Sequence, residues 1–188
     1  MDSLHIDFQK TALVLIDLQK GIVQFPGGQE VVAKAAELVK RFRQNEGFIS
    51  FVNVEFHDGK DALKPATDQP AASSERPADW AEFAPKLGVT KDDYVVTKRQ
   101  WGAFFGTDLD LQLRRRGIDT IVLCGIATNI GVESTAREAF QFGYNQVFIT
   151  DAMVSFSQEE HDASCRFIFP KIGKVRTTDE FLTNTQVN

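Results

Sequence analysis

The chain has 188 residues, a net charge of −5 and two cysteines. Its length predicts one domain over residues 1–188, with enough apolar residues for a sizeable core. The acidic balance argues against nucleic-acid binding, which needs a basic face, and two cysteines are too few for a disulfide framework. Because neither a signal peptide nor a membrane-spanning run is evident, we expect a cytoplasmic protein that binds neither nucleic acid nor membranes.

Apolar runs rich in β-forming residues predict the strands. In chain order they cover residues 12–16, 48–54, 94–97, 120–124 and 146–150, with a weaker sixth run at 171–175. Most of these runs are continuous rather than alternating. That pattern is typical of strands that are buried on both faces of a parallel sheet.

Helical patterns separate the strands. Apolar residues repeat at helical spacing over 31–42 and form an apolar stripe over 132–140. Two further helices are predicted, one over the leucine-containing segment 109–113 and one over 158–169. Thr107 and Asp110 resemble a weak capping box for the second helix, and Ser157 is a candidate N-cap for the fourth. Strands alternating with helices predict an α/β fold built from βαβ units with right-handed crossovers.

One long irregular stretch covers residues 55–93 and contains four of the six prolines. A connection of this length inside a compact domain is usually functional or an interaction surface. We expect Trp80 and Phe83 to pack it against the domain. Whether it closes over a ligand as a lid is left open by the sequence.

Chemistry-bearing residues follow three of the predicted strands. Asp17 follows the first strand, Lys98 the third, and the glycine-containing segment 125–131 the fourth. Ligands of open α/β sheets bind outside the carboxyl ends of the strands, so the fold can bring these groups together. Each also has a simpler interpretation: Asp17 as a turn former or helix cap, Lys98 as a solvated cation. The glycines fit neither the dinucleotide fingerprint nor the P-loop.

Two stretches resemble a known family. Residues 96–109 are similar to its segment Lys-x-x-x-Ser-Ala-Phe-x-Gly-Thr-x-Leu, except that Gly102 stands where Ser is common. Residues 121–137 are similar to its signature Gly-Val-x-Thr-x-x-Cys-Val-x-x-Thr-Ala-Arg. Leu15-Ile-Asp-Leu-Gln19, Gly143 and Asp151-Ala152 extend the match, which covers roughly residues 10 to 155. The chain thus resembles the isochorismatase-like superfamily, also called cysteine hydrolases.

This resemblance implies a Rossmann-like, six-stranded parallel sheet with helices on both faces, in a homodimer or homotetramer. In cysteine-bearing members an Asp, a Lys and a Cys cooperate, and the matching residues here are Asp17, Lys98 and Gly131. Glycine has no side chain, so covalent catalysis at this position is ruled out. Cys124 and Cys165 are expected to be small buried hydrophobes rather than substitutes.

The resemblance also implies a cis peptide between Ile126 and Ala127. It would aim the amides of Ala127 and Gly131 into the pocket, where a helix N-terminus can bind a carboxylate or an oxyanion. Members that hydrolyse the vinyl ether of isochorismate also carry Gly at the nucleophile position. Their reaction implies a carboxylic acid that protonates the methylene carbon, and Asp17 is the candidate for that acid.

The charge of Lys98 creates a tension for this role. An ammonium lowers the pKa of a neighbouring carboxyl, whereas burial raises it. We hypothesise that the bound substrate dianion pairs with Lys98 and so restores the proton on Asp17.

A carboxylated substrate needs further donors, and Arg76 and Arg99 are candidates, although Arg99 follows Lys98 directly and is expected to face the opposite way. Trp101, Phe104 and Phe105 are expected to wall the pocket, and Phe104 also fits a core position. Ala127 and Thr128 are expected at the substrate, with Thr128 and Asn129 also able to cap the helix or brace the loop. Arg137 and Asp151 are expected to form a structural pair.

No cofactor is predicted. Glu55 and His57 lie where some relatives bind a metal, but two ligands do not make a zinc site, so no metal is predicted.

Two other functions stay open. The chain could be a catalytically idle homologue that binds small molecules or partners. It could also be an amidase or ureidohydrolase that activates water without a thiol. The loop after the second predicted strand does not match the substrate-binding residues of isochorismatases, so the sequence leaves the substrate undetermined.

Overall fold

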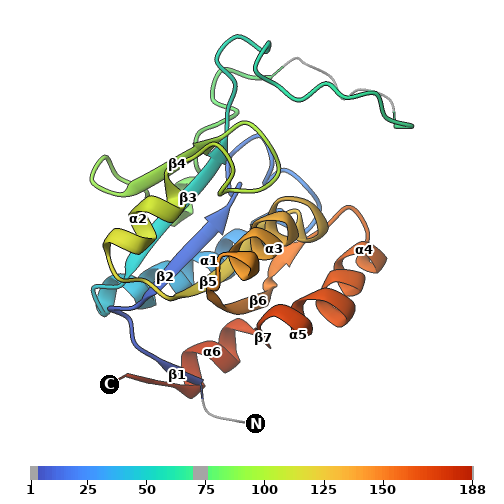
Figure 1. Cartoon of the computed structure of the whole chain (residues 1–188). Helices are drawn as coiled ribbons and strands as arrows, with labels where there is room; N and C mark the ends of the chain where they lie inside the picture. Colours follow the sequence, from blue (N-terminus) through green and yellow to red (C-terminus); the bar gives the residue numbers. More distant parts are fainter. Residues whose placement is uncertain (1–3, 70–75, 188) are drawn as a thin grey trace.

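A computed structural model describes residues 4–69 and 76–187 (Figure 1). Its central sheet has six parallel strands in the order β4-β3-β2-β5-β6-β7. They are β2 (Thr11–Ile16), β3 (Phe48–Val54), β4 (Tyr94–Lys98), β5 (Thr120–Ile126), β6 (Asn145–Val154) and β7 (Lys174–Arg176). The predicted α/β fold with a six-stranded parallel sheet is therefore confirmed. The strand order reverses between β2 and β5, so the ends of these two strands lie at a topological switch point.

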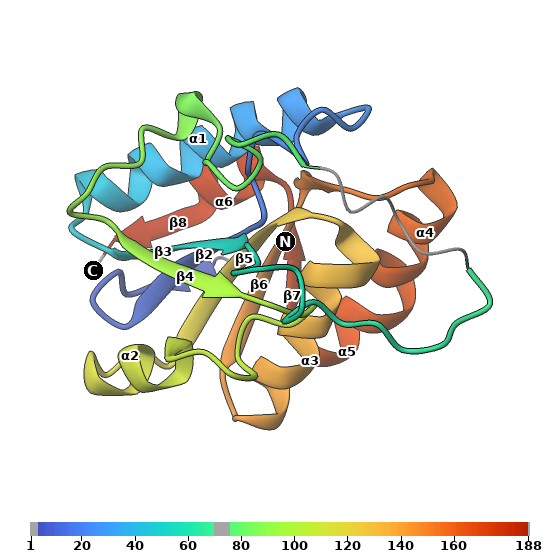
Figure 2. The same ribbon diagram turned by 90° about the horizontal axis from the view of Figure 1, so that it is seen from above.

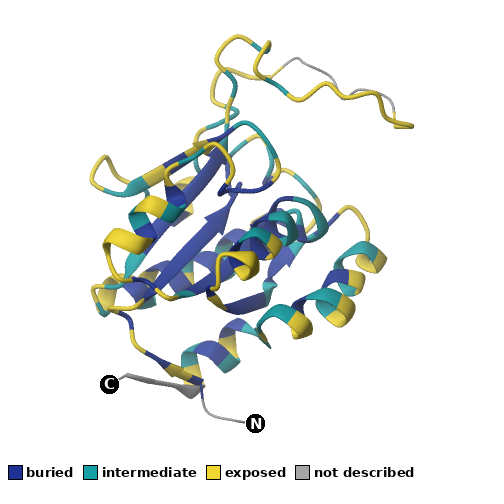
Figure 3. Ribbon diagram, viewed as in Figure 1, coloured by how far each residue is buried: buried dark blue, intermediate teal, exposed yellow. Residues whose placement is uncertain are grey.

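Helices cover both faces of the sheet (Figure 2). One face is covered by α1 (Gly28–Gln44) and α6 (Thr178–Asn184), and the other by α2 (Leu109–Arg115), α3 (Glu133–Gln141) and α5 (Phe169–Ile172). All six residues of β2 are buried, as expected for a strand between two helical layers (Figure 3). Among the described residues, no helix is both long and apolar enough to cross a membrane.

The fourth predicted helix and the start of α2 differ from the predictions. The fourth predicted helix is divided into α4 (Gln158–Ala163), a π-helical turn η3 (Ser164–Ile168) and α5. Ser157 does cap it: its Oγ accepts a hydrogen bond from the Glu160 amide, and the Glu160 carboxylate accepts one from the Ser157 amide. The expected capping box of α2 is wrong, because Thr107 Oγ1 instead accepts from the amide of Leu109, where the helix begins.

Three elements near the ends of the described chain were not predicted. They are β1 (Leu4–Ile6), β8 (Thr185–Val187) and α6. The two short strands pair in parallel, which makes a second, two-stranded sheet. The weak sixth run lies three residues too early, since β7 begins after Gly173.

The described part of the long connection between β3 and β4 includes a short 3-10 turn, η1 (Pro85–Leu87). Its described first part reaches out beyond the ends of these strands in Figure 1. The later part packs down as predicted. Trp80 covers Gly21, where an added Cβ would lie 1.8 Å from Trp80 Cδ1, and the Phe83 ring packs on Phe51 at a centroid distance of 5.7 Å.

Candidate active site

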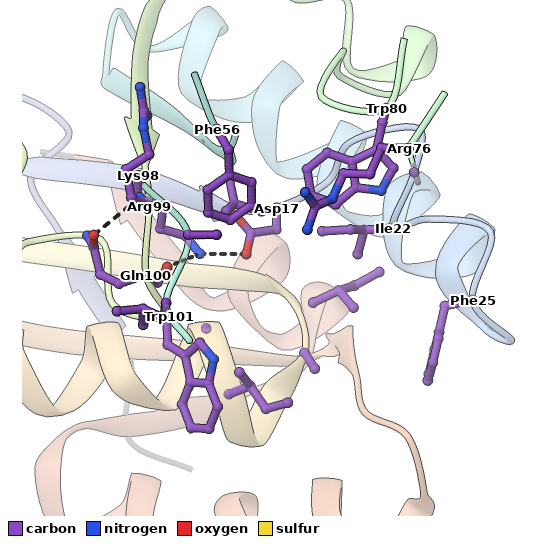
Figure 4. Close-up of a pocket in the computed structure, with 18 of the residues that line it drawn as sticks. Asp17, Ile22, Phe25, Phe56, Arg76, Trp80, Lys98, Arg99, Gln100 and Trp101 are labelled. Carbon is purple, nitrogen blue, oxygen red and sulfur yellow. Dashed lines mark hydrogen bonds and ion pairs between the residues drawn. The ribbon is translucent and has the colours of Figure 1, made fainter. Parts of the chain in front are cut away.

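A cavity of about 1460 Å³ opens at the carboxyl ends of the strands. Asp17 directly follows β2, Lys98 ends β4, and the segment after β5 brings Ala127 and Gly131 to the same place. All four residues line this cavity, and Figure 4 shows Asp17 and Lys98 facing each other within it. The structure thus brings together the three groups that the sequence marked for catalysis.

Asp17 and Lys98 form a buried ion pair. Lys98 Nζ donates to Asp17 Oδ2 at 2.7 Å and to the carbonyl oxygen of Gln100 at 3.0 Å. Relative exposure is only 5% for Asp17 and 2% for Lys98. Asp17 has a left-handed backbone with φ of 53°, and its amide donates to the carbonyl of Val52, which fixes where its side chain starts. Asp is one of the few non-glycine residues that tolerate this conformation.

Burial outweighs the ammonium in setting the proton affinity of Asp17. Removal from water raises its pKa from 3.8 to about 6, although the charge and hydrogen bond of Lys98 both lower it. The second carboxylate oxygen, Oδ1, is buried and has no hydrogen-bond partner among the described residues. A buried carboxylate oxygen without a donor favours the protonated form, so Asp17 can hold a proton near neutral pH.

Gly131 leaves space beside this carboxyl group. A Cβ added there would lie 3.2 Å from Asp17 Oδ2, 2.9 Å from Ile16 Cγ2 and 3.5 Å from the carbonyl oxygen of Trp101. A substrate seated against Gly131 is therefore within contact distance of Asp17. The same geometry explains why a residue with a side chain at this position would face the Asp–Lys pair.

The segment that carries Gly131 is a π-helical turn, η2 (Thr128–Val132), which leads into α3. The peptide bond between Ile126 and Ala127 is cis, and the amides of Ile130 and Val132 both donate to the carbonyl of Ala127. The predicted helix therefore starts with a wider turn than an α-helix, directly at the cavity.

The two candidate arginines are placed differently. The Arg99 guanidinium points away from Asp17 in Figure 4 and pairs with Asp61 at 2.8 Å. Arg76 lies between two aromatic rings, with its guanidinium carbon 4.6 Å from the Phe56 ring centroid and 4.7 Å from that of Trp80. Among the described residues no carboxylate pairs with Arg76. The edges of its guanidinium can therefore donate to a ligand in the cavity.

Two expected substrate contacts lie elsewhere. Phe104 does not line the cavity: it is buried between α2 and α3, with its ring against those of Phe142 and Tyr144. Thr128 is fully buried, and its Oγ1 lies 2.8 Å from Nδ1 of His161. Both expectations are corrected, because packing in the core and a helix contact use these side chains. Trp101 does line the cavity.

The described structure adds wall residues that the sequence did not single out as substrate contacts. They are Ile22, Phe25, Phe56, Lys64, Trp80, Gln100 and Phe156. Most come from irregular loops, where no periodicity marks a side chain as facing a cavity. Phe105, expected in the wall, is 73% exposed and does not line the cavity.

Neither cysteine lies at the cavity. Cys124 is fully buried in β5, and burial raises the pKa of its thiol. Cys165 Sγ lies 3.4 Å from Nε2 of His161, and burial raises the pKa of Cys165 to about 11. Both thiols stay protonated at neutral pH and so are poor nucleophiles.

The expected pair of Arg137 and Asp151 is wrong. Arg137 pairs with Glu133 one helical turn away at 2.9 Å, whereas Asp151 accepts hydrogen bonds from Thr178 on α6. No group of three His, Cys, Asp or Glu side chains in the described part of the chain is placed to hold a metal. The absence of a metal and of a cofactor stays a prediction.

The family model for the isochorismatase domain matches residues 11–180. The chain belongs to the isochorismatase family. It is an isochorismatase-family hydrolase, and the resemblance of its sequence to the family signature puts Gly131 at the position of the nucleophile.

Relatives within this family differ in what their names record. The uncharacterized isochorismatase family protein YwoC of Bacillus subtilis is 74% identical over 97% of this chain and 97% of its own length. A solved isochorismatase family protein from Burkholderia thailandensis is 49% identical, with a TM-score of 0.91 over 95% of this chain and 96% of that one. More distantly, the ureidoacrylate amidohydrolase RutB of Acinetobacter baylyi is 32% identical over all of this chain and 77% of its own.

Proposed function

We propose that this chain hydrolyses the vinyl ether of a small carboxylate of the isochorismate type, without a covalent intermediate and with Asp17 as general acid. The observation that carries the proposal is the buried Asp17, whose pKa is raised to about 6 beside a glycine that offers no nucleophile. General acids work best when their pKa lies near the working pH.

The reaction follows from these groups. Asp17 gives its proton to the methylene carbon of the enolpyruvyl group, which leaves an oxocarbenium ion and an Asp17 carboxylate held by Lys98. Water adds to the oxocarbenium carbon and returns a proton to Asp17. The resulting hemiketal then breaks its bond to the ring oxygen, which takes up the hydroxyl proton, and pyruvate and a dihydrodiol leave. Lys98 stabilises the carboxylate that forms during the first step.

Charge in the cavity supports an anionic substrate. Lys98 is paired with Asp17, and Arg99 is paired with Asp61. Two further cations of the described lining, Arg76 and Lys64, form no ion pair with a described carboxylate. A substrate with one or two carboxylates would complete the charge balance, and a planar guanidinium can bind a carboxylate through two parallel hydrogen bonds.

Replacing Arg76 tests this assignment. We expect Arg76→Gln to raise KM by about tenfold or more, because a charge-assisted contact to the carboxylate is lost. Arg99→Gln is the matched control and should change KM by less than about threefold, since its partner is Asp61 rather than substrate. Steady-state kinetics of both variants decide this; a larger effect at Arg99 than at Arg76 would reverse the assignment.

A substrate panel tests the function itself. Purified protein is incubated with isochorismate, ureidoacrylate and nicotinamide, and pyruvate and ammonia are measured. The proposal expects one pyruvate and one dihydrodiol per isochorismate, with no ammonia from the other two compounds. Ammonia release would favour an amidase that activates water, and no turnover of any of the three would favour a binding protein. A homodimer or homotetramer stays a prediction that a sedimentation measurement can check.

A further inference from the structure

The hydroxyl group of Thr135 connects two segments beside the cavity, the turn that contains Gly131 and the loop that follows β4. Thr135 lies on the first turn of α3 and is fully buried. Its Oγ1 donates to the carbonyl oxygen of Gly131 at 2.7 Å and accepts from the amide of Ala103 at 3.1 Å. The first partner belongs to the turn beside Asp17, and the second belongs to the loop that follows β4 and Lys98.

Within that loop, Gln100 connects the backbone to Lys98. The Gln100 side chain donates to the carbonyls of Gly102 and Phe105, and the Gln100 carbonyl accepts from Lys98 Nζ. The loop backbone also lies directly on Gly131, since the Trp101 carbonyl oxygen is 3.5 Å from the place of an added Cβ there. A shift of the loop would therefore move a hydrogen-bond acceptor of Lys98 and the wall beside Gly131 together.

Glu138, one turn further along α3, strengthens this attachment. Its Oε2 accepts from the amide of Phe104 at 3.3 Å, and a Cβ added to Gly102 would lie 2.2 Å from the same oxygen. The glycine that stands where relatives commonly carry Ser thus makes room for the carboxylate. Two successive amides of the loop, from Ala103 and Phe104, are bound by α3 in this way.

We infer that Thr135 is a positioning residue: its hydroxyl fixes the loop that holds Lys98 against the Gly131 turn, and so keeps Lys98 on Asp17. Thr135 does not line the cavity and takes no part in proton transfer. For its kinetic readout the inference rests on the proposed function. Its second readout, the titration of Asp17, needs no substrate.

The test compares Thr135→Val, which keeps the shape but removes the hydroxyl, with Thr135→Ser, which keeps the hydroxyl. The pKa of Asp17 is measured by NMR of carboxyl-labelled aspartate. Burial raises this pKa, and the charge and hydrogen bond of Lys98 lower it. We expect Thr135→Val to raise the pKa further, by about half a unit or more, because the ammonium is held less well. Thr135→Ser should titrate like the parent protein.

A distant buried hydroxyl controls for a general loss of stability. Thr178→Val removes a fully buried hydroxyl that donates to Asp151 on the face covered by α6, and it should leave the titration of Asp17 unchanged. If Thr135→Val titrates like the parent, or if Thr178→Val shifts Asp17 as much, the inference is overturned.

Kinetic measurements on Thr135→Val distinguish a failure of this inference from a failure of the proposed function. With isochorismate, Thr135→Val is expected to lose about tenfold in kcat with KM within about twofold, because the groups that react are displaced while the carboxylate contacts remain. An unchanged kcat would contradict the inference. If the parent protein releases no pyruvate but the pKa shift is found, the proposed function fails and the positioning role of Thr135 stands.

Discussion

Asp17→Asn is expected to lower kcat for pyruvate release by about a thousandfold, within the range that a single general acid contributes. The amide cannot give a proton to carbon, so the oxocarbenium ion no longer forms with help from the protein. Its carbonyl oxygen can still accept from Lys98, which keeps the geometry of the pair. KM should change little, because the carboxylate contacts are made by other residues. The measurement is steady-state pyruvate release at a pH near 6.

The backbone conformation at Asp17 can accommodate asparagine. Asp17 has a positive φ of 53°, a conformation that Asn adopts as readily as Asp, so a local distortion is not expected. Circular dichroism and the thermal midpoint should confirm a folded variant. Asp17→Glu serves as a second variant: it keeps an acid but displaces it, and should retain more activity than Asn. An Asn variant within about tenfold of the parent would remove Asp17 from the acid's role.

Lys98→Met is expected to destabilise the fold in a way that depends on pH. Removing the ammonium leaves the buried Asp17 without its partner, and a broken buried pair typically costs about 3–5 kcal/mol when the remaining charge stays ionised. Asp17 escapes part of this cost by keeping its proton. The loss of unfolding free energy should therefore be small near pH 5 and reach about 3 kcal/mol near pH 8.

The raised pKa of Asp17 determines whether stability rises or falls with pH. Asp17 has its pKa raised from 3.8 to about 6, so the folded chain binds this proton more tightly than the unfolded chain. The stabilising contribution is complete below the unfolded value and is lost as the pH rises through about 6. Without Lys98 the pKa of Asp17 rises further, so the free energy of unfolding keeps falling to a higher pH than in the parent protein.

Urea unfolding of Lys98→Met at both pH values measures this effect. The control is the double variant Asp17→Asn/Lys98→Met, in which neither side chain titrates. Its stability relative to Asp17→Asn should not depend on pH. A loss for Lys98→Met that is equal at the two pH values would contradict the account, since the charge of Asp17 would then have no part in it.

The parts of this site that could be predicted are those that depend on strand order. Asp17 follows the buried strand β2 and Lys98 ends the edge strand β4, and the carboxyl ends of parallel strands lie at one edge of the sheet. Gly131 was placed by its position in the family signature. The positions of these three residues are set by the order of the strands in the sheet. The continuous apolar runs and the family resemblance both indicated that order.

The errors concern side chains whose direction depends on tertiary packing. Phe104 matches the family motif, yet it turns into the core beside Tyr144, and Thr128 turns towards His161. The sandwich of Arg76 between Phe56 and Trp80 joins residues of a loop without periodicity, so no pattern in the sequence indicates it. The pairing of β1 with β8 joins distant parts of the chain and has no local signal either.

The pH dependence of kcat/KM for pyruvate release from isochorismate tests the central claim most directly, because this quantity reports the ionisation of the free enzyme. An essential acid with the pKa of Asp17 predicts a plateau at low pH and a tenfold fall per pH unit above about 6. A rate that rises with pH through the same range would contradict the account, since Asp17 would then act in its ionised form.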